Sequence, residues 1–361
     1  MNIVILAGGQ GTRLWPLARK NSPKQFFPMI SKKPLVKETY DRFVKRFGKN
    51  KIFFSVTKEL APSLKKIFPG LPARHFIVEP SRRDTAPAMG YVVAQLFVTA
   101  PDEPVVFVPI DHFIADQQKF LDTLGVAEGL VLTTGKLLDM GITATFPSTV
   151  LGYTKIGKLL SGKDAVKVYA FAGHTEKPDV RRAIKYVTSG NYLWHGNYYM
   201  WTPRSFFGAF KRYQPKMSVI LEQIITAIKN KKDQEVGALY EQLEKISFDY
   251  AITKNISKKD VLIVKGEFGW SDIGAWDVLH EQLREPEGDA QGNVVKGNVV
   301  HIDTTNCLIY GEEKHIVAAV GLDNIVIVDT PDALLVCPKN RAQDVKKLLP
   351  EIEKRGLKKY L

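Results

Sequence analysis

The chain has 361 residues, enough for two domains and a large core, and its 45% hydrophobic and 25% charged residues are typical of a globular protein. No stretch approaches the ~20 apolar residues of a membrane-spanning helix and no leader precedes the first glycines, so we expect a cytoplasmic protein with no membrane partner. The net charge of +13 comes from dispersed lysines without a nucleic-acid-binding motif, which favours small anionic ligands over nucleic acid.

The opening sequence combines a strand, a glycine-rich turn and two basic residues. The apolar run Ile3–Ala7 predicts a buried strand, and the glycines that follow it, in LAGGQGTRLWPLARKNSPKQ, let backbone amides approach a phosphate closely. A turn without a ligand is the alternative for the glycines alone. The run is neither a Walker motif nor a dinucleotide fingerprint, because Trp15-Pro16 interrupts any helix and no Gly-Lys-Ser/Thr is present. Arg13 and Lys24 instead suit a polyphosphate held by side chains and backbone amides.

Strands and amphipathic helices alternate as far as about Leu279, which predicts an open, mostly parallel sheet covered by helices. Further strands within Gly141–Gly157 and Val166–Glu176 are expected to form a local mixed sheet, and a long helical region is expected at Pro203–Lys245. The expected strands of the main sheet are NIVILA, KIFFSV, HFIVEP, PVVFVPI and DVLIVKG, with helices at Val36–Phe47 and Ala86–Val98.

The segment Arg284–Asn293, REPEGDAQGN, is rich in Pro, Gly and charged residues and indicates a domain boundary. Short strands with closely spaced turns follow it, as in a small β-rich unit of the β-helix kind, and a basic helix is expected at Ala342–Arg355. We therefore expect domains at residues 1–285 and 290–361. Cys307 and Cys337 lie far apart in apolar runs and are expected to be buried and reduced.

Two aspartates follow expected strands of the main sheet. In an open α/β sheet, ligands bind beyond the carboxyl ends of the strands. Asp111 follows PVVFVPI and Asp272 follows DVLIVKG, and two such carboxylates suit a Mg²⁺ ion shared with phosphates. A helix cap or a turn is the alternative role of each aspartate. Ser, Cys and His residues show no nucleophile arrangement, which disfavours a covalent mechanism.

An ordered set of motifs resembles the nucleotidyltransferases that activate sugar 1-phosphates, and WPL and PKQF resemble their mannose-1-phosphate guanylyltransferase (GDP-mannose pyrophosphorylase) branch. The motifs cover nearly the whole chain: LAGGQGTRLWPLARKNSPKQF, EPSRRDTAPA, VPIDHFI, PSTVLGYTKIG, TEKPD, FDYAI, FGWSDIGAW and VGLDNIVIVDTPDALLV. The resemblance implies an α/β fold with a Rossmann-like, mixed and mostly parallel sheet of the GT-A type and a small β-helix-like C-terminal domain. It also implies a homodimer and Mg²⁺-dependent transfer of GMP from GTP to mannose 1-phosphate, giving GDP-mannose and pyrophosphate.

The resemblance assigns roles to residues of this sequence. Arg13, Lys24 and Asp111 would be catalytic, and Asp111 and Asp272 would hold Mg²⁺. GTP would be bound by Leu6, Ala7, Gly8, Gly9, Gly11, Thr12, Arg13, Lys24, Glu79 and Thr85. The sugar phosphate would be bound by Gly152, Tyr153, Glu176, Lys177, His195 and Asn197.

The sequence also departs from the family pattern. In WHGNYYMW, His195 takes the place of an asparagine and Asn197 stands where glycine is expected, while Asp84 replaces an asparagine in EPSRRDTAPA. These departures leave open another sugar 1-phosphate (glucose, fucose or a heptose) or another nucleotide. A catalytically silent subunit that binds nucleotide sugars is a further alternative, which the retained charged site residues argue against.

Overall fold

A computed structural model describes residues 1–9, 11–162 and 166–361, and the chain forms two compact units that are interleaved in sequence. The first unit consists of Met1–Gly8, Tyr40–Pro109 and Ile114–Trp270, and the second of Gly9–Thr39, Ile110–Phe113 and Ser271–Leu361. The second unit therefore joins most of the opening loop, residues 7–34 between the first strand and the first long helix, to the C-terminal part of the chain. The domains expected at 1–285 and 290–361 describe successive segments of the sequence, and they stay a prediction. The two compact units of the folded chain have different boundaries.

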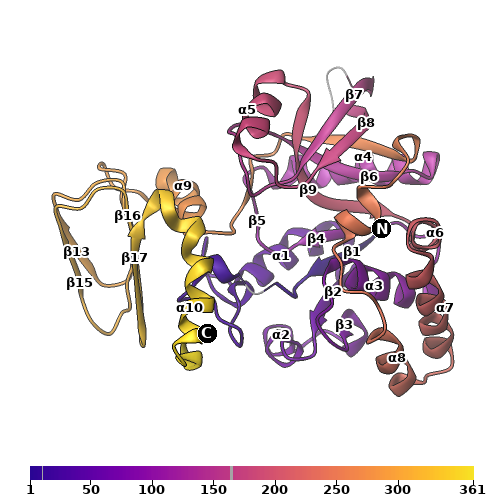
Figure 1. The fold of residues 1–361 in the computed structure, drawn as a ribbon, viewed down its shortest axis with the longest axis horizontal. Helices are drawn as coiled ribbons and strands as arrows, with labels where there is room; N and C mark the ends of the chain where they lie inside the picture. The colour runs from indigo at the N-terminus through magenta and orange to yellow at the C-terminus, as the bar shows by residue number, and fades with distance from the viewer. Residues whose placement is uncertain (10, 163–165) are drawn as a thin grey trace. The chain divides into compact units, whose positions relative to one another are not determined.

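The first unit is built on a nine-stranded sheet (Figure 1). In spatial order its strands are β3 (Phe76–Glu79), β2 (Ile52–Thr57), β1 (Asn2–Leu6), β4 (Val105–Pro109), β9 (Tyr192–Trp201), β6 (Leu137–Thr143), β10 (Val261–Gly266), β8 (Val168–Thr175) and β7 (Tyr153–Ser161). The strands from β3 to β4 are parallel, as are β6 and β10, whereas β9 and β8 are antiparallel to their neighbours. The expected mixed, mostly parallel sheet is confirmed. β1 and β4 are apolar throughout most of their length because both faces of a central parallel strand are covered.

Helices pack on this sheet and on one another; α4, for example, lies against β6, β9 and β10. They are α1 (Leu35–Phe47), which continues from the second unit into the first, α2 (Ala61–Ile67), α3 (Thr85–Thr99), α4 (Gln117–Thr134), α5 (Val180–Ser189), α6 (Pro203–Tyr213), α7 (Pro215–Lys229) and α8 (Asp233–Tyr240). Side-chain caps begin several of them: Asp116 accepts from the Lys119 amide at 2.9 Å and Asp179 from the Arg182 amide at 2.9 Å. A short π-helix, η5 (Asp249–Thr253), follows α8.

The local mixed sheet expected from the strands in Gly141–Gly157 and Val166–Glu176 forms as part of the main sheet. β7 and β8 extend the main sheet beyond β10, and β7 also pairs antiparallel to β9. Within Gly141–Gly157, β6 ends at Thr143, a loop containing Pro147 follows, and β7 begins at Tyr153. Sequence patterns predicted strands here correctly but could not predict which edge they pair with.

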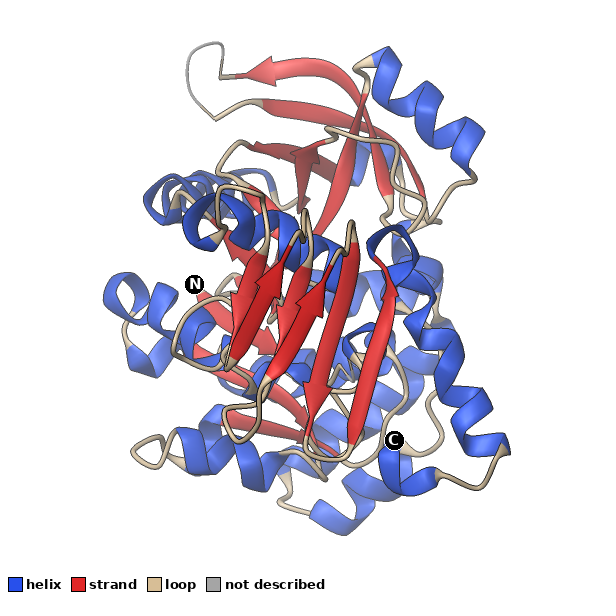
Figure 2. Ribbon diagram, turned by 90° about the vertical axis from the view of Figure 1, so that its left-hand side faces the viewer, coloured by secondary structure: helices blue, strands red, loops and turns tan. Residues whose placement is uncertain are grey.

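The second unit contains the β-rich C-terminal part, whose strands lie side by side in Figure 2. β12 (Val294–Lys296), β14 (Leu308–Tyr310) and β16 (Ile325–Thr330) are parallel, and β17 (Ala333–Pro338) pairs antiparallel to β16. β13 (Val299–Ile302) and β15 (Val317–Val320) form a second parallel sheet. Parallel strands repeated in two sheets are the arrangement of a β-helix, as expected. Cys307 is buried in this part and Cys337 is half-buried, and both thiols are free.

A single apolar cluster connects the opening loop to this β-rich part within the second unit. The fully buried Trp276 begins α9 (Trp276–Glu287), and its Nε1 donates to the Trp15 carbonyl oxygen at 3.1 Å. The Trp15 Nε1 in turn donates to the Tyr360 carbonyl oxygen at 2.8 Å. The other buried members are Leu14, Ala18, Met29, Leu35, Ile273, Leu279, Leu283, Val294, Leu308, Val326, Val328, Leu335, Ala342 and Val345.

Two further details of the second unit correct the sequence predictions. α9 continues into the expected boundary segment and ends at Glu287, one residue after Pro286, so the proline lies in the last turn of the helix. The expected helix Ala342–Arg355 is a 3₁₀ helix at Lys339–Lys347 followed by the α-helix α10 (Leu348–Lys354).

Two short strands, β5 (His112–Ile114) and β11 (Trp270–Asp272), pair with each other. None of the helices formed by the described residues is long and apolar enough to cross a membrane.

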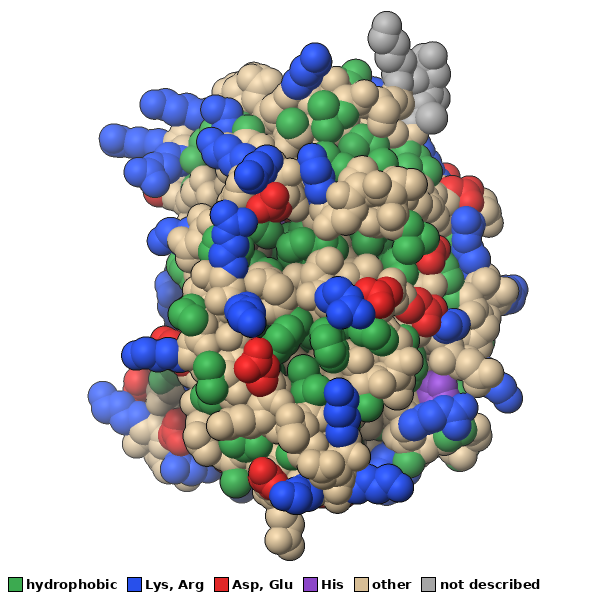
Figure 3. All heavy atoms as spheres, turned by 90° about the vertical axis from the view of Figure 1, so that its right-hand side faces the viewer, with side chains coloured by type: hydrophobic (Ala, Val, Ile, Leu, Met, Phe, Trp, Pro, Cys, Tyr) green, Lys and Arg blue, Asp and Glu red, His purple; other side chains and the backbone are tan. Residues whose placement is uncertain are grey.

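Basic side chains are distributed rather than concentrated on the face shown in Figure 3, where lysines and arginines alternate with apolar and acidic groups. This distribution is that of a solvated surface and not of a continuous basic groove.

Candidate functional site

The loop after β1 depends on a glycine at position 11. Gly11 has a φ of 68°, and a Cβ at this position would lie 2.9 Å from the Lys24 Cγ. Its carbonyl oxygen accepts from the Leu14 amide at 2.9 Å, which begins the 3₁₀ turn Thr12–Leu14. Only glycine therefore permits both the left-handed backbone and the close passage of the lysine stem.

The predicted nucleotide-binding backbone is distributed over both units. Leu6, Ala7 and Gly8 belong to the first unit, where the Ala7 amide donates to the Ser55 carbonyl oxygen at 2.8 Å. Gly9, Gly11, Thr12, Arg13 and Lys24 belong to the second. Gln10, between the two groups of glycines, lies outside the described residues.

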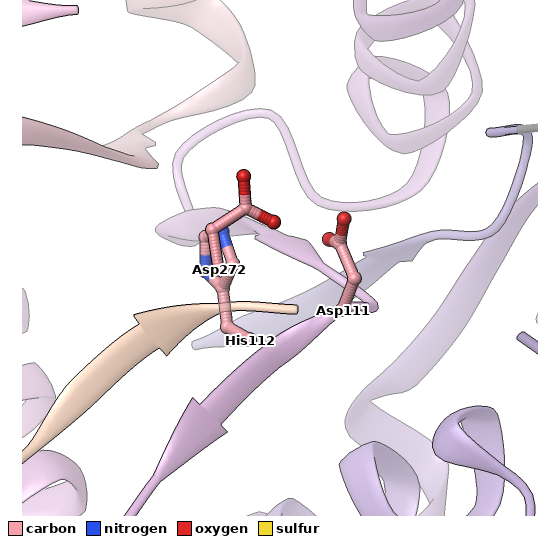
Figure 4. Close-up of side chains that lie close together, drawn as sticks. All are labelled: Asp111, His112 and Asp272. Carbon is pink, nitrogen blue, oxygen red and sulfur yellow. The ribbon is translucent and has the colours of Figure 1, made fainter. Parts of the chain in front are cut away.

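Within the second unit, the two predicted metal-binding aspartates and Lys24 come together. The Lys24 ammonium forms an ion pair with the Asp111 carboxylate, and its Nζ also lies 3.4 Å from the Ile273 carbonyl oxygen. Asp111, His112 and Asp272 each place one ligand atom within 4.8 Å of the others (Figure 4). Asp111 lies between β4 and β5 and Asp272 ends β11, so neither aspartate caps a helix.

The two carboxylates of this cluster have pKa values shifted in opposite directions. Burial would raise the pKa of Asp111, but the Lys24 ammonium and His112 hold it well below its usual range. Burial, and then the neighbouring Asp111 carboxylate, raise the pKa of Asp272. Positive charge beside Asp272, which Lys24 and Arg13 already supply, lowers the pKa of its carboxyl, and a bound cation would lower it further.

The donor set fits a magnesium ion. The Oδ1 atom of Asp272 is buried, and no described residue donates a hydrogen bond to it. Carboxylate oxygens are the hard ligands that Mg²⁺ prefers, and Asp111 and Asp272 each place one carboxylate oxygen within 4.8 Å of the other. An orphaned, buried carboxylate oxygen next to a second carboxylate is the feature that such an ion would satisfy.

Arg13 extends toward the same cluster. Its Nη1 would lie 3.5 Å from a Cβ at Gly274, two residues after Asp272, and its positive charge acts on that carboxylate. The Arg13 Nε is buried without a hydrogen-bond partner among the described residues. A guanidinium with an unused donor suits an incoming phosphate.

In the first unit, Glu79 lies close to the end of β1. Its side chain is buried, accepts from the Ser55 hydroxyl at 3.1 Å and from the Tyr240 hydroxyl at 3.2 Å, and its Oε1 would lie 3.9 Å from a Cβ at Gly8. Burial raises the pKa of Glu79. The Thr85 hydroxyl accepts from the Phe248 amide at 2.8 Å, so this side chain also ties α3 to the segment before η5.

The raised pKa of Glu79 predicts that the stability of the protein depends on pH. The folded protein binds the Glu79 proton more tightly than the unfolded chain does, so stability should fall as the pH rises from the ordinary value of 4.5 through the raised pKa. Glu79→Gln removes this titration and should be more stable than the wild type above that range, with the difference shrinking toward acid pH. Urea unfolding from about pH 4 to 8 measures it. Glu222→Gln, at an exposed position of α7, is the control. If the free energies of unfolding of Glu79→Gln and the wild type differ by the same amount at every pH, the prediction is wrong.

Four of the predicted sugar-phosphate residues converge within the first unit. The Gly152 carbonyl oxygen accepts from the His195 amide at 2.8 Å, and a Cβ on Gly152 would lie 2.6 Å from the Glu176 Oε2. Glu176 also pairs through Oε1 with the Lys177 Nζ at 2.5 Å.

The other two residues are placed differently. Tyr153 is fully buried, with its ring 5.4 Å from that of Tyr186. Asn197 is exposed, with a φ of 55°, at a bulge where the register between β6 and β9 shifts, so it does not follow His195 on the same face.

Gly152→Ala is expected to disturb this group of residues. The added methyl overlaps the Glu176 carboxylate and approaches the His174 Cε1 to 3.0 Å, which should cost ~1–3 kcal/mol of stability and raise KM for the sugar phosphate. Urea unfolding and steady-state kinetics measure the two effects. Gly129→Ala is the matched control, because a Cβ there meets nothing within 4 Å and alanine favours the helix α4. Equal KM and stability in Gly152→Ala and wild type would contradict the prediction.

Sequence reasoning missed the buried partners of His195. Its Nδ1 lies 2.9 Å from the Asp139 Oδ2, and its Nε2 lies 3.5 Å from the Asp249 Oδ1. Burial would lower the pKa of His195, but these two carboxylates raise it to about 10. The available signal was Asp139 itself, a lone charge in the apolar strand LLDMGIT. Asp249 stands in the motif FDYAI, to which no chemistry was assigned.

Comparisons with known proteins show the family to which the chain belongs. The family model "Nucleotidyl transferase" matches residues 2–287, and "MannoseP isomerase/GMP-like beta-helix domain" matches residues 297–352. The chain is 33% identical to the alginate biosynthesis protein AlgA of Pseudomonas putida, over 98% of this chain and 72% of AlgA. It is 30% identical to a mannose-1-phosphate guanylyltransferase of Escherichia coli, over 99% of this chain and 76% of that protein.

A solved structure is also similar over nearly its whole length. A protein of Thermus thermophilus, described as a mannose-1-phosphate geranyltransferase, is 27% identical and superposes with a TM-score of 0.86, covering 98% of this chain and 99% of the other. Both parts of the fold therefore occur together in another protein.

Proposed function

Because the chain belongs to the nucleotidyl transferase family and, within it, to the group of the mannose-1-phosphate guanylyltransferases, we propose that it transfers GMP from GTP to mannose 1-phosphate. The products are GDP-mannose and pyrophosphate. The observation that supports this proposal most directly is that Lys24, Asp111 and Asp272 come together. The Lys24 side chain passes so close to position 11 that only glycine fits there.

The reaction needs positioning and charge more than it needs a base. The phosphate oxygen of the sugar 1-phosphate is already an anion when it attacks the α-phosphorus of GTP in line, and pyrophosphate leaves. Asp111 and Asp272 would hold Mg²⁺, which supplies charge neutralisation at the phosphates. Lys24 and Arg13 would neutralise the triphosphate and the departing pyrophosphate, since both carry charge at this cluster.

A Mg²⁺ ion held by Asp111 would change the partners of Lys24. In the structure its ammonium is paired with Asp111, the same carboxylate proposed to hold the ion. A carboxylate shared with a divalent cation attracts the ammonium less, which leaves Lys24 able to follow the phosphates.

The base and the sugar are assigned to groups of the first unit. Glu79 and Thr85 would lie near the guanine, and the backbone of Leu6, Ala7 and Gly8 would continue the contacts made by Gly9, Gly11 and Thr12. Glu176 would bind sugar hydroxyls and Lys177 the phosphate, with Gly152, Tyr153, His195 and Asn197 around them. The pairing of Glu176 with Lys177 and the contact of Gly152 with His195 support this assignment.

The test is pyrophosphate release with Mg²⁺ across the nucleoside triphosphates and a panel of sugar 1-phosphates. Release confined to GTP with mannose 1-phosphate is the expected result. Strong release with glucose, fucose or heptose phosphate would retain the mechanism and assign a different specificity to WHGNYYMW. Folded protein that releases pyrophosphate with no pair would overturn the proposal in favour of a silent binding subunit.

We also propose a homodimer through the β-rich part. Apolar side chains there are exposed to solvent, among them Ile302 at 59% and Val320 at 68%. Such side chains on neighbouring strands suit a partner surface, and light scattering of the full chain measures the state. A monomer at micromolar concentration would contradict this part of the proposal.

A further inference from the structure

Arg19 lies in the opening loop between Arg13 and Lys24, and its side chain joins two parts of the second unit. Its Nε donates to the Pro16 carbonyl oxygen, within the loop, at 2.9 Å. Its guanidinium also forms an ion pair with both carboxylate oxygens of Asp332: Nη1 donates to Oδ2 at 2.7 Å, and Nη2 donates to Oδ1. Such a bidentate pair fixes the orientation of both groups.

Asp332 belongs to the two-residue turn that joins β16 to β17. Pro331 and Asp332 form this turn, and Thr330 pairs with Ala333 across it. The Thr330 hydroxyl donates to the Ala333 carbonyl oxygen at 2.8 Å and accepts from the Arg19 Nη2 at 3.3 Å. β16 is buried along most of its length. The carboxylate that binds Arg19 is therefore held by a hairpin that is anchored in the β-rich part.

The backbone of Arg19 sets the path of the chain toward Lys24. Its amide donates to the Ser22 carbonyl oxygen at 3.0 Å, and the Ser22 amide donates to the Arg19 carbonyl oxygen at 3.1 Å. Pro23 follows directly, and its carbonyl oxygen accepts from the Phe26 amide at 3.1 Å, next to the 3₁₀ turn that begins at Lys24. Because proline restricts its own backbone, little freedom remains between Ser22 and Lys24.

The same guanidinium restrains the chain that leads back to Arg13. Pro16, whose carbonyl oxygen accepts from the Arg19 Nε, comes three residues after Arg13. Trp15 lies between these two residues, and its carbonyl oxygen accepts from the Trp276 Nε1 at 3.1 Å. Arg13 and Lys24 are the two cations proposed to neutralise the triphosphate, so one side chain restrains both ends of the segment that carries them.

We propose that Asp332 is a positioning residue for the nucleotide: through Arg19 it holds the opening loop in the conformation in which Arg13 and Lys24 meet the phosphates of GTP. This inference rests on the proposed function and deepens it, because it gives the β-rich part a role in triphosphate binding. Four of the five N–H donors of the Arg19 guanidinium are used by Pro16, Thr330 and Asp332. Arg19 therefore acts through its geometry and not as a further phosphate ligand.

The test is the affinity of the full chain for GTP with Mg²⁺, measured by titration calorimetry without a sugar phosphate, so that no turnover is needed. Asp332→Asn replaces one of the two acceptor oxygens with an amide group, and the Kd for GTP should rise ~3–5-fold. Arg19→Lys keeps the charge but cannot bridge both oxygens and the Pro16 carbonyl, so the Kd should rise ~10-fold. The double variant should bind no more weakly than Arg19→Lys, because the two residues act as a unit.

Steady-state kinetics separates positioning from a loss of folding. Asp332→Asn should raise KM for GTP but leave KM for the sugar 1-phosphate near that of the wild type, since the proposed sugar-phosphate residues lie in the first unit. Its Tm should stay within ~2 °C of the wild type, because Asp332 is 46% exposed and such pairs contribute little to stability. A purely structural role would lower the Tm and leave the affinity for GTP unchanged.

A second aspartate of the same unit is the matched control. Asp344 accepts from the Arg341 Nε at 2.7 Å on the surface, and Asp344→Asn should bind GTP as the wild type does. Wild-type protein that binds no GTP, or Asp332→Asn and Arg19→Lys that both bind it as tightly as the wild type, would overturn this inference. Wild-type protein that binds GTP with the expected dependence on Asp332 but releases no pyrophosphate would contradict the proposed function and support this inference.

Discussion

Asp111→Asn is expected to lower kcat about 100-fold or more while leaving the fold intact. Asparagine keeps the shape of the side chain but removes the charge that holds Lys24 and would hold Mg²⁺. The lost interaction acts on charge that develops at the transferred phosphoryl group, so kcat should fall more than KM rises. Initial rates of pyrophosphate release at saturating GTP and sugar phosphate measure the effect.

A surface carboxylate paired with an arginine provides the matched control. Asp102 is 67% exposed and accepts from the Arg204 Nε at 2.7 Å, so Asp102→Asn removes an ion pair without approaching the cluster. Its kcat should equal that of the wild type, since exposed pairs contribute little. Circular dichroism tests whether Asp111→Asn is folded. Folded Asp111→Asn with a near-normal kcat would exclude the proposed role of this carboxylate.

Trp276→Ala is expected to destabilise the second unit by ~3–5 kcal/mol. The indole is fully buried, packs near the Tyr310 ring and donates to the Trp15 carbonyl oxygen, so truncation leaves a cavity and an unsatisfied acceptor. Because Trp15 lies in the opening loop, activity should fall together with stability. Urea unfolding followed by circular dichroism gives the free energy.

An exposed leucine calibrates the size of that loss. Leu132 is 61% exposed on α4, and Leu132→Ala should change stability by no more than about 0.5 kcal/mol. Trp276→Phe should lie between the wild type and Trp276→Ala because it fills part of the cavity. If Trp276→Ala unfolds as the wild type does, the cluster does not hold the opening loop as the structure indicates.

The strands of the main sheet could be predicted because a strand that is buried on both faces is a run of apolar residues in the sequence. β1 and β4 are largely apolar runs. Because ligands bind at the carboxyl ends of strands in such a sheet, the sequence also predicted that Asp111 and Asp272 lie near each other. The family itself followed from motifs in order, and the matched family models confirm it.

The side-chain partners could not be predicted in the same way. Pairing of Lys24 with Asp111 depends on how distant segments meet, and no local pattern encodes it. The bulge in β9 separates His195 from Asn197, although their spacing in a regular strand would place them on one face. His174 and Asp249 come from different elements, so only the folded sheet brings them beside Glu176.

The bond from the Trp15 indole to the Tyr360 carbonyl oxygen joins residues 345 positions apart in the chain. During synthesis the opening loop emerges from the ribosome first, whereas Trp276 and the strands that complete its cluster emerge last. Contacts that span nearly the whole sequence form late, because a very long loop must close before they yield any stabilisation. A nascent chain can therefore pair the strands of its main sheet before the opening loop has its packing partners, and we expect activity only after Trp276 and the strands of its cluster have been made.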